Sequence, residues 1–371
     1  MRWQWKLGTF AGIDVFIHAT FLLLIGWIGY SHWLQFGTIA KVVEGIAFIL
    51  VLFLCVVLHE YGHALTARRY GVKTRDITLY PIGGVARLER MPEKPIEELW
   101  VALMGPAVNV VIAGLLFAYL FLTRGLPPMT DISVASGSFV ARVMIVNIWL
   151  VLFNLIPAFP MDGGRVLRSL LALRLEYTRA TRIAATVGQG LAVLFAIAGL
   201  FTNPFLLFIG LFVWSGAAQE ASMVQMKTAL GGVPVRRAML TNFQALSPRD
   251  SLSRALQLIL SGVQTDYPVV EDNGTVVGML RRSDALARLS RPGQDIPVAG
   301  IMRRDFPTAD ANDMLEMALA RLQASECQTM PVTYAGQLVG LLTLDNIGEF
   351  LRVQSALSRT HSRDRLQTRE A

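Results

Sequence analysis

Charged residues and cysteine are scarce in this sequence. Only 16% of the 371 residues are charged, against about a quarter in an ordinary soluble domain. The two cysteines, Cys55 and Cys327, fall in different halves of the chain, so no disulfide framework is available and nothing demands an oxidising compartment. Cys55 lies in an apolar run, where a buried thiol is favoured over a metal ligand. These scarcities exclude a disulfide-rich secreted domain and favour a membrane protein.

A cleavable leader is also not evident. The first long apolar run, about residues 16–34, follows Arg2 and Lys6. It is too long for the apolar part of a signal peptide, and no small-x-small cleavage pattern follows it. We therefore expect this run to be the first membrane span.

Long apolar runs are concentrated in the first 225 residues. Windows of spanning length lie near 15–34, 42–67, 97–123, 139–158, 184–201 and 204–223. The sequence therefore predicts a polytopic α-helical membrane core of about six transmembrane helices over 1–225. A linker at 226–232 and a more polar C-terminal region follow it.

Lysine and arginine are unevenly distributed between these windows. Twelve follow the second and fourth windows, which puts them on one side of the predicted membrane core. Three lie in or at the edge of the segments on the opposite side of the membrane. The twelve are Arg68, Arg69, Lys73, Arg75, Arg87, Arg90, Lys94, Arg165, Arg168, Arg174, Arg179 and Arg182; the three are Lys41, Arg124 and Arg142. By the positive-inside rule, the N-terminus, the even loops and the C-terminal region should be cytoplasmic.

The C-terminal region contains an internal repeat. Ala238-Met239 recurs as Ile301-Met302, and Tyr267-Pro268-Val269-Val270 recurs as Met330-Pro331-Val332-Thr333. Each copy has the pattern of a helix, a strand with proline near its start, a turn, a second strand and a short helix. In the first copy Asp272-Asn273-Gly274 is a strong hairpin signal. We expect an α/β module with one copy at 233–291 and the other at 292–353, followed by a disordered basic tail at 354–371.

This repeat resembles a tandem pair of CBS domains. The resemblance implies an adenine nucleotide site built from a hydroxyl residue and an acid in each copy. The first copy has Arg281 at the hydroxyl position and then Asp284, and the second has Thr343 but Asn346 at the acid position. Asp284 and Thr343 are therefore candidate ligand residues, and a dimerisation or substrate-docking module is the alternative. The basic tail could also contact anionic membrane lipid.

A metal-binding pattern lies at the end of the second apolar window. His59-Glu60-x-x-His63 places two imidazoles on one face of a helix, which matches two corners of a tetrahedral zinc site. Glu60 can reach a zinc-bound water without being a ligand and act as the general base. Two histidines that only pack are the alternative, but the pattern follows Ile49–Leu58 at membrane depth, where ionisable groups are functional by default.

A catalytic zinc needs a third protein ligand, and Asp162 is the candidate. It lies in Asn154-Leu-Ile-Pro-Ala-Phe-Pro-Met-Asp162-Gly-Gly-Arg165, where proline and glycine interrupt an apolar run. Irregular backbone at that depth is tolerated only where protein or a water-filled cavity covers it. A helix cap at the membrane boundary is the alternative for this carboxylate.

Together, the two patterns resemble the site-2 protease family of intramembrane zinc proteases, over about residues 1–225. The resemblance implies one zinc held by His59, His63 and Asp162, with Glu60 as catalytic base. It also implies that Asn154 positions substrate or stabilises an oxyanion, for which a polar contact between helices is the alternative. Gly105-Pro106-x-x-Asn109 also matches the family; close helix packing is the main interpretation, with Asn109 a further candidate for the site.

A short β-element is expected immediately after the zinc motif. Ile77–Leu88 contains two short strand patterns around Gly83-Gly84, where the family has a membrane-associated β-element. A free strand edge could hold an unwound substrate by adding a strand to the sheet, and a simple structural hairpin is the alternative.

The sequence therefore predicts an intramembrane zinc endopeptidase that cleaves membrane-spanning or membrane-bound proteins near the cytoplasmic side. The resemblance suggests a membrane-tethered transcription, sigma or anti-sigma factor as substrate, with the CBS pair in regulation, docking or homodimer formation. We expect no nucleic-acid partner. A CBS-regulated transporter and an inactive membrane scaffold are the competing hypotheses.

Overall fold

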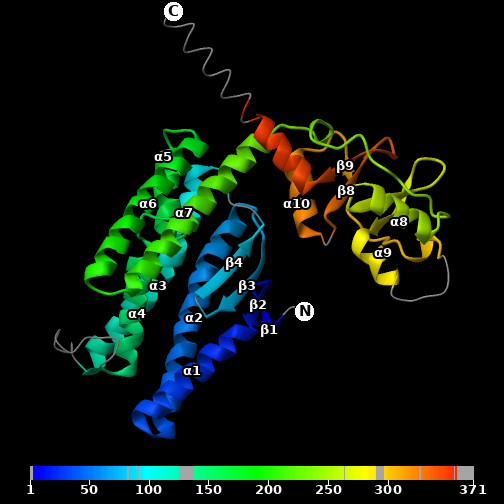
Figure 1. Cartoon of the computed structure of the whole chain (residues 1–371). Coiled ribbons are helices and arrows are strands. Elements are labelled where there is room, and N and C mark those ends of the chain that lie inside the picture. Colours follow the sequence, from blue (N-terminus) through cyan, green and yellow to red (C-terminus); the bar gives the residue numbers. More distant parts are fainter. Residues whose placement is uncertain are drawn as a thin grey trace, which may run out of the picture. The chain divides into compact units, whose positions relative to one another are not determined.

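The chain divides into two compact units, Met1–Val224 and Gln225–Ala371, which are described separately (Figure 1). The computed structural model describes residues 3–81, 83–89, 92, 94–124, 137–262, 264–289, 296–325, 327–354 and 356. Apart from residues 354 and 356, the predicted basic tail lies outside the described residues.

The first unit begins with a sheet that sequence patterning found only in part. Its strand order is β1-β2-β3-β4, and its strands are β1 (Gln4–Phe10), β2 (Ile13–His18), β3 (Thr74–Tyr80) and β4 (Gly83–Leu88). The two predicted strands are confirmed as β3 and β4, an antiparallel pair. β2 joins β3 in parallel and β1 in antiparallel orientation.

The first predicted span, 15–34, therefore starts too early. Residues up to His18 belong to β2, and helix α1 (Ala19–Phe36) begins only after it. The sequence contains the apolar–polar alternation of a strand at Ile13-Asp14-Val15. In the structure Ile13 and Val15 are buried, while Asp14 between them is more exposed. The span at 15–34 was predicted from the apolar content of the window, which hid this period-two alternation. The pairing of β2 with two neighbours decides for a strand.

Helices make up the rest of the first unit. They are α2 (Ile39–Arg69), α3 (Pro95–Arg124), α4 (Phe139–Asn154), α5 (Asp162–Ala172), α6 (Tyr177–Phe201) and α7 (Phe205–Leu230). The sheet packs against α2, and α2 packs against α3 (Figure 1). Short α5 lies between the spans and packs on both α3 and α6.

Four helices in the described part of the chain are long and apolar enough to span a membrane: α2, α3, α6 and α7. The predicted count of six is not confirmed. Of the other two predicted spans, α1 has 18 residues, and α4 is apolar but has only 16. Both are short for the ~20 residues that a hydrocarbon core of about 30 Å requires.

The second unit has the predicted repeat. The first copy contains α8 (Leu252–Ser261), β5 (Asp266–Val270), β6 (Val276–Arg281) and α9 (Arg282–Leu289). The second contains β7 (Ala309–Asp310), α10 (Leu315–Ala324), β8 (Thr329–Tyr334), β9 (Gln337–Thr343) and a helix over 344–354. Each copy has a short 3-10 turn near its start, η2 (Val235–Arg237) in the first and η3 (Val298–Gly300) in the second. Gly274 has a φ of 84° at the predicted hairpin turn, a conformation that favours glycine.

Candidate metal centre

Three side chains from two helices meet at one buried point in the first unit. His59 and His63 lie on α2, and Asp162 is the first residue of α5. The Nε2 atoms of the two histidines are 3.1 Å apart. Asp162 Oδ2 lies 3.2 Å from Nε2 of His59 and 3.1 Å from Nε2 of His63. The structure thus brings together the three residues that the sequence proposed as metal ligands, and all three are buried.

The backbone of α3 determines the tautomer of His63. Its Nδ1 lies 2.7 Å from the carbonyl oxygen of Val101. A carbonyl can only accept, so Nδ1 of His63 carries the proton. In the neutral ring Nε2 then keeps a bare lone pair, which points toward the shared point.

A chain of amides fixes His59 in the same way. Asn147 Nδ2 donates to the Val143 carbonyl at 2.8 Å, which leaves Asn147 Oδ1 to accept from Asn109 Nδ2 at 2.7 Å. Asn109 Oδ1 in turn accepts from His59 Nδ1 at 2.6 Å. Each amide is oriented by the next, and the last partner is a carbonyl that cannot donate. His59 therefore also presents a bare Nε2.

This donor set fits zinc. Two unprotonated imidazole nitrogens and a carboxylate oxygen lie 3.1–3.2 Å from one another. A tetrahedral zinc with bonds of roughly 2.0–2.2 Å would hold its ligand atoms about 3.3–3.6 Å apart. Without a cation, two lone pairs and a negative oxygen would face each other in a buried site, which is costly. Three protein ligands also leave the open fourth position that a catalytic zinc needs.

Glycines allow the helices to approach closely enough to build this site. A Cβ at Gly62 of α2 would lie 2.5 Å from the carbonyl oxygen of Met104 in α3. A Cβ at Gly105 of α3 would lie 2.1 Å from Nε2 of His63. Small residues at such contacts are typical of packed membrane helices. The packing role predicted for Gly105 thus has a local purpose, which is to leave room for the imidazoles.

The loop before α5 delivers Asp162. α4 ends at Asn154, and residues 155–161 are irregular before α5 starts. A Cβ at Gly163 would lie 2.3 Å from the carbonyl oxygen of Ile156, and one at Gly164 would lie 2.6 Å from the carbonyl carbon of Ala158. The loop therefore folds tightly over the first turn of α5, as the proline and glycine pattern predicts, and it covers the polar backbone with protein.

Glu60 lies beside the sheet. It follows His59 on α2, and a Cβ at Gly84 of β4 would lie 3.1 Å from Glu60 Cγ. Since β4 is the last strand in the order β1-β2-β3-β4, one edge of the sheet runs past this carboxylate. Val85, the next residue of β4, is 45% exposed.

Comparisons with known proteins show the family to which this chain belongs. Residues 47–138 and 129–197 match Peptidase family M50, and residues 235–291 and 298–352 match the CBS domain. Zinc metalloprotease MJ0392 of Methanocaldococcus jannaschii is 36% identical over 282 residues, which is 76% of this chain and 78% of that protein. The chain belongs to peptidase family M50, the site-2 protease family. It is a zinc metalloprotease with a C-terminal CBS pair.

Two further relatives cover smaller parts of this M50 protease. Stage IV sporulation protein FB of Bacillus subtilis is 27% identical over 156 residues, which is 42% of this chain and 51% of that protein. The solved structure "Site-2 Protease from Methanocaldococcus jannaschii" is 36% identical with a TM-score of 0.43, covering 59% of this chain and 95% of that one.

Three asparagines of the M50 core make contacts that the motifs alone did not predict. Asn154 ends α4, and its Nδ2 donates to the Leu150 carbonyl at 3.0 Å, so its substrate role stays a prediction. Asn109, the further candidate for the site, contacts the imidazole of His59, and its role toward substrate or an oxyanion stays a prediction. Asn147 was missed altogether, although an asparagine in the middle of an apolar helix was itself a signal.

Arg168 corrects the charge count used for orientation. It was counted among the basic residues of a cytoplasmic loop, but its side chain is 1% exposed. Its guanidinium donates to Glu98 of α3 and to Glu220 of α7. Because it is neutralised inside the protein, it says nothing about which side of the membrane the loop faces.

The candidate nucleotide residues of the CBS pair both have partners within their own unit. Asp284 accepts from Nε of Arg281 at 3.0 Å and from Nε of Arg303 at 2.9 Å. The bond from Arg281, followed by the one from Arg303, lowers the pKa of the Asp284 carboxyl. Thr343 Oγ1 bonds to Asn346 Oδ1 at 2.5 Å. A cavity of about 630 Å³ lies beside this cluster, lined by Arg303, Arg304, Asp305, Phe306, Pro307, Ala324, Ser325 and Cys327.

Proposed function

We propose that this M50 protease hydrolyses a peptide bond of a membrane-spanning or membrane-bound protein, with His59, His63 and Asp162 as its zinc ligands. The observation that carries the proposal is that Nε2 of His59, Nε2 of His63 and Oδ2 of Asp162 lie 3.1–3.2 Å from one another in a buried site. Zinc held there supplies Lewis-acid polarisation of a carbonyl and lowers the pKa of water to about 7. Glu60 then accepts the water proton and returns it to the leaving amine.

Zinc content tests the ligand set. Purified protein in detergent is expected to contain about one zinc per chain, and His59→Ala to lose it, because two remaining ligands bind weakly. His32→Ala is the matched control, since His32 lies on α1 and its Nδ1 lies 3.0 Å from the Ile28 carbonyl of its own helix. Metal analysis of the three proteins decides. Equal zinc in wild type and His59→Ala would contradict the ligand assignment.

We propose that the substrate is bound as a strand along the edge of β4. A transmembrane helix shields its own peptide bonds, so it must unwind before hydrolysis. Strand addition would satisfy the exposed backbone groups of the unwound segment. The short distance between Gly84 and Glu60 supports this site, because a segment on the β4 edge would lie next to the proposed base. A structural hairpin alone would not need this position.

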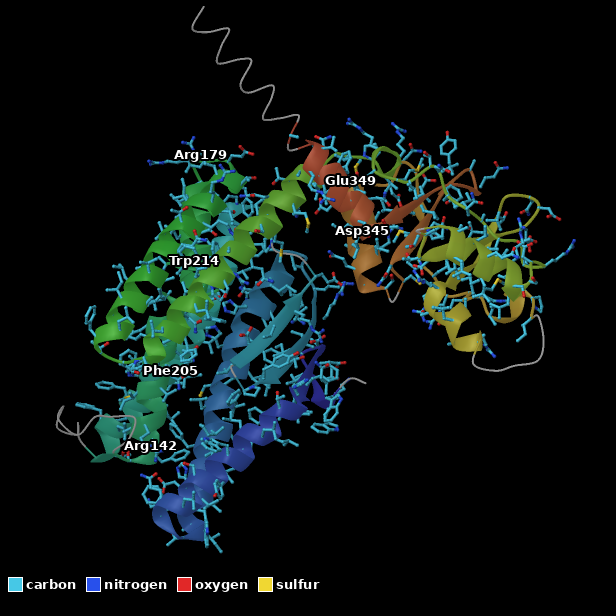
Figure 2. The ribbon with its side chains drawn as sticks, in the orientation of Figure 1. Arg142, Arg179, Phe205, Trp214, Asp345 and Glu349 are labelled. Carbon is cyan, nitrogen blue, oxygen red and sulfur yellow. The ribbon has the colours of Figure 1, made fainter. Side chains whose placement is uncertain are left out.

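We propose that the metal centre lies near the cytoplasmic side of the membrane, and the positions of the basic segments support this. Arg179, near the start of α6, and Arg142, near the start of α4, lie at opposite ends of the helical unit (Figure 2). The basic end of α2, with Arg68 and Arg69, follows His63 by less than two turns. With positive charge inside, this end of the zinc helix faces the cytoplasm. The proposal also includes a multi-pass topology with both termini in the cytoplasm.

We further propose that the CBS pair regulates the protease through α7. This helix bears Glu220, which contacts Arg168 of α5. Its last residues belong to the second unit, where Leu230 is part of the hydrophobic core and Lys227 lies 3.6 Å from Glu316. The two units are therefore joined within α7, whose residues up to Val224 belong to the first unit and whose last residues belong to the second.

AMP binding tests the regulatory module. The nucleotide phosphate is expected to bind Arg303 and Arg304 of the 630 Å³ cavity, because guanidinium groups pair with phosphate oxygens. Saturating AMP should raise the melting temperature of the full chain, as any ligand of the native state does. Arg304→Ala should weaken the apparent affinity for AMP about tenfold, whereas Arg249→Ala, an exposed arginine outside that cavity, should not. If neither AMP nor ATP gives a saturable shift, the dimerisation or docking interpretation is favoured.

A further inference from the structure

One stripe of α3 contacts both histidines. The carbonyl of Val101 orients His63, Gly105 leaves room for the rings, and Asn109 orients His59. These positions recur every four residues and so lie on one face of the helix. Glu98 continues the stripe one turn earlier, and it is 1% exposed. A buried carboxylate on this stripe, one turn before the residue that contacts His63, needs an explanation.

The partner of Glu98 is Arg168, which lies on the helix that begins with Asp162. Arg168 Nε donates to Glu98 Oε1 at 2.8 Å, and a second guanidinium nitrogen donates to the same oxygen. A third donates to Glu220 Oε1 at 2.5 Å. The guanidinium also lies 5.0 Å from the ring centroids of both Phe159 and Tyr177. Arg168 therefore makes hydrogen bonds and ring contacts with several elements around α5.

Stability alone does not explain this set of contacts. Replacing a buried ion pair by packed apolar residues is often neutral or stabilising, so such a pair is weak evidence for a role in stability. What the pair does provide is direction, since a planar guanidinium bonds in few orientations. Arg168 is six residues after Asp162, about 9 Å along the axis of α5. Holding the middle of this 11-residue helix fixes the depth and rotation of its first residue.

We propose that Arg168 is a positioning residue for the metal centre, acting through α5 on Asp162. Bonded to Glu98, it sets α5 against the same stripe of α3 that orients both histidines, so one helix face positions all three ligands. The proposal rests on the ligand set proposed above. A clamp with a purely structural role would change stability but leave the coordination of any bound metal unaltered.

Metal affinity and metal spectroscopy separate these two roles. Arg168→Lys keeps the positive charge but loses the planar guanidinium with its several donors. The affinity for Zn²⁺ should therefore fall about 10- to 100-fold, as measured by chelator competition on the folded full chain. With Co²⁺ in place of zinc, the visible absorption bands should change, because they report the geometry of the ligands. Glu220→Gln removes one charged partner at a partly exposed position and should give a smaller loss in the same direction.

Arg142→Lys is the matched control. Arg142 also pairs with a glutamate of another helix, Glu44, at 3.0 Å, and it lies 4.4 Å from the ring centroid of Phe48. It stands at the opposite end of the helical unit from Arg179 (Figure 2). This control should keep wild-type zinc affinity and cobalt spectrum even where it melts lower.

The outcomes are distinct. Wild-type affinity and spectrum in Arg168→Lys overturn the proposal; if that variant does not fold, wild-type values in Glu220→Gln overturn it. A wild-type protein without zinc, or one whose zinc survives His59→Ala, would instead mean that the ligand set itself is wrong.

Discussion

Glu60→Gln is expected to lower the rate of substrate cleavage about 10²- to 10⁴-fold while leaving zinc content and melting temperature unchanged. An amide of nearly the same shape can neither accept the water proton nor return it, and proton transfer by a positioned side chain is worth about 10²- to 10⁴-fold. The partial burial of Glu60 beside β4 leaves little room for a replacement base to enter. Cleavage of a co-expressed membrane substrate, followed by immunoblot, measures the effect.

The control for this variant is Glu44→Gln. Glu44 lies on the same helix α2 but bonds to Lys41 and Arg142, away from the histidines. It should cleave at the wild-type rate. Glu60→Gln cleaving as fast as wild type would rule out Glu60 as the general base.

The same variant also reports where substrate binds. With the reaction stopped, a photoreactive residue at Val85 of β4 should crosslink to substrate, because strand addition at that edge places the two backbones about 4.8 Å apart. The matched position is Trp5, which is 52% exposed on β1 at the other end of the sheet order. Adducts at Trp5 but not at Val85 would show that the substrate uses a different edge.

The sequence was sufficient for the parts of the site that local spacing determines. His59 and His63 share a helix face because of their four-residue spacing, and Asp162 could be found because proline and glycine interrupt an apolar run beside it. The strands around Gly83 and Gly84 and the CBS repeat were predictable for the same reason. Each of these signals depends on residues close together in the chain.

The parts that failed depend on contacts between distant segments. Whether Arg168 is a loop charge or a buried partner of Glu98 is decided by the packing of α5 on α3, across 70 residues of chain. The strand at Ile13–His18 pairs with Thr74–Tyr80, so its apolar composition alone looked like the start of a span. The link from Asn109 to Asn147 likewise joins two helices.

Gly105→Ala is expected to abolish zinc binding and cleavage together. The new methyl group would lie 2.1 Å from Nε2 of His63 and 2.8 Å from Nε2 of His59, far inside contact distance. A ring could swing away only by giving up its bond to the Val101 carbonyl or to Asn109, each of which also fixes its tautomer. Losing such a partner costs about 10- to 100-fold in metal affinity, and here both rings are displaced.

Gly114→Ala on the same helix separates this effect from helix propensity. A Cβ at Gly114 meets nothing within 4 Å, so the substitution should raise helix stability by up to about 1 kcal/mol and leave zinc content at the wild-type level. Overpacking at Gly105 should instead cost about 1–3 kcal/mol in addition to the lost metal. Metal analysis and thermal melts of both variants make the comparison. Full zinc content in Gly105→Ala would mean that α2 and α3 can move apart without losing the metal site. The close approach of the two helices would then not be the feature that holds the imidazoles in place.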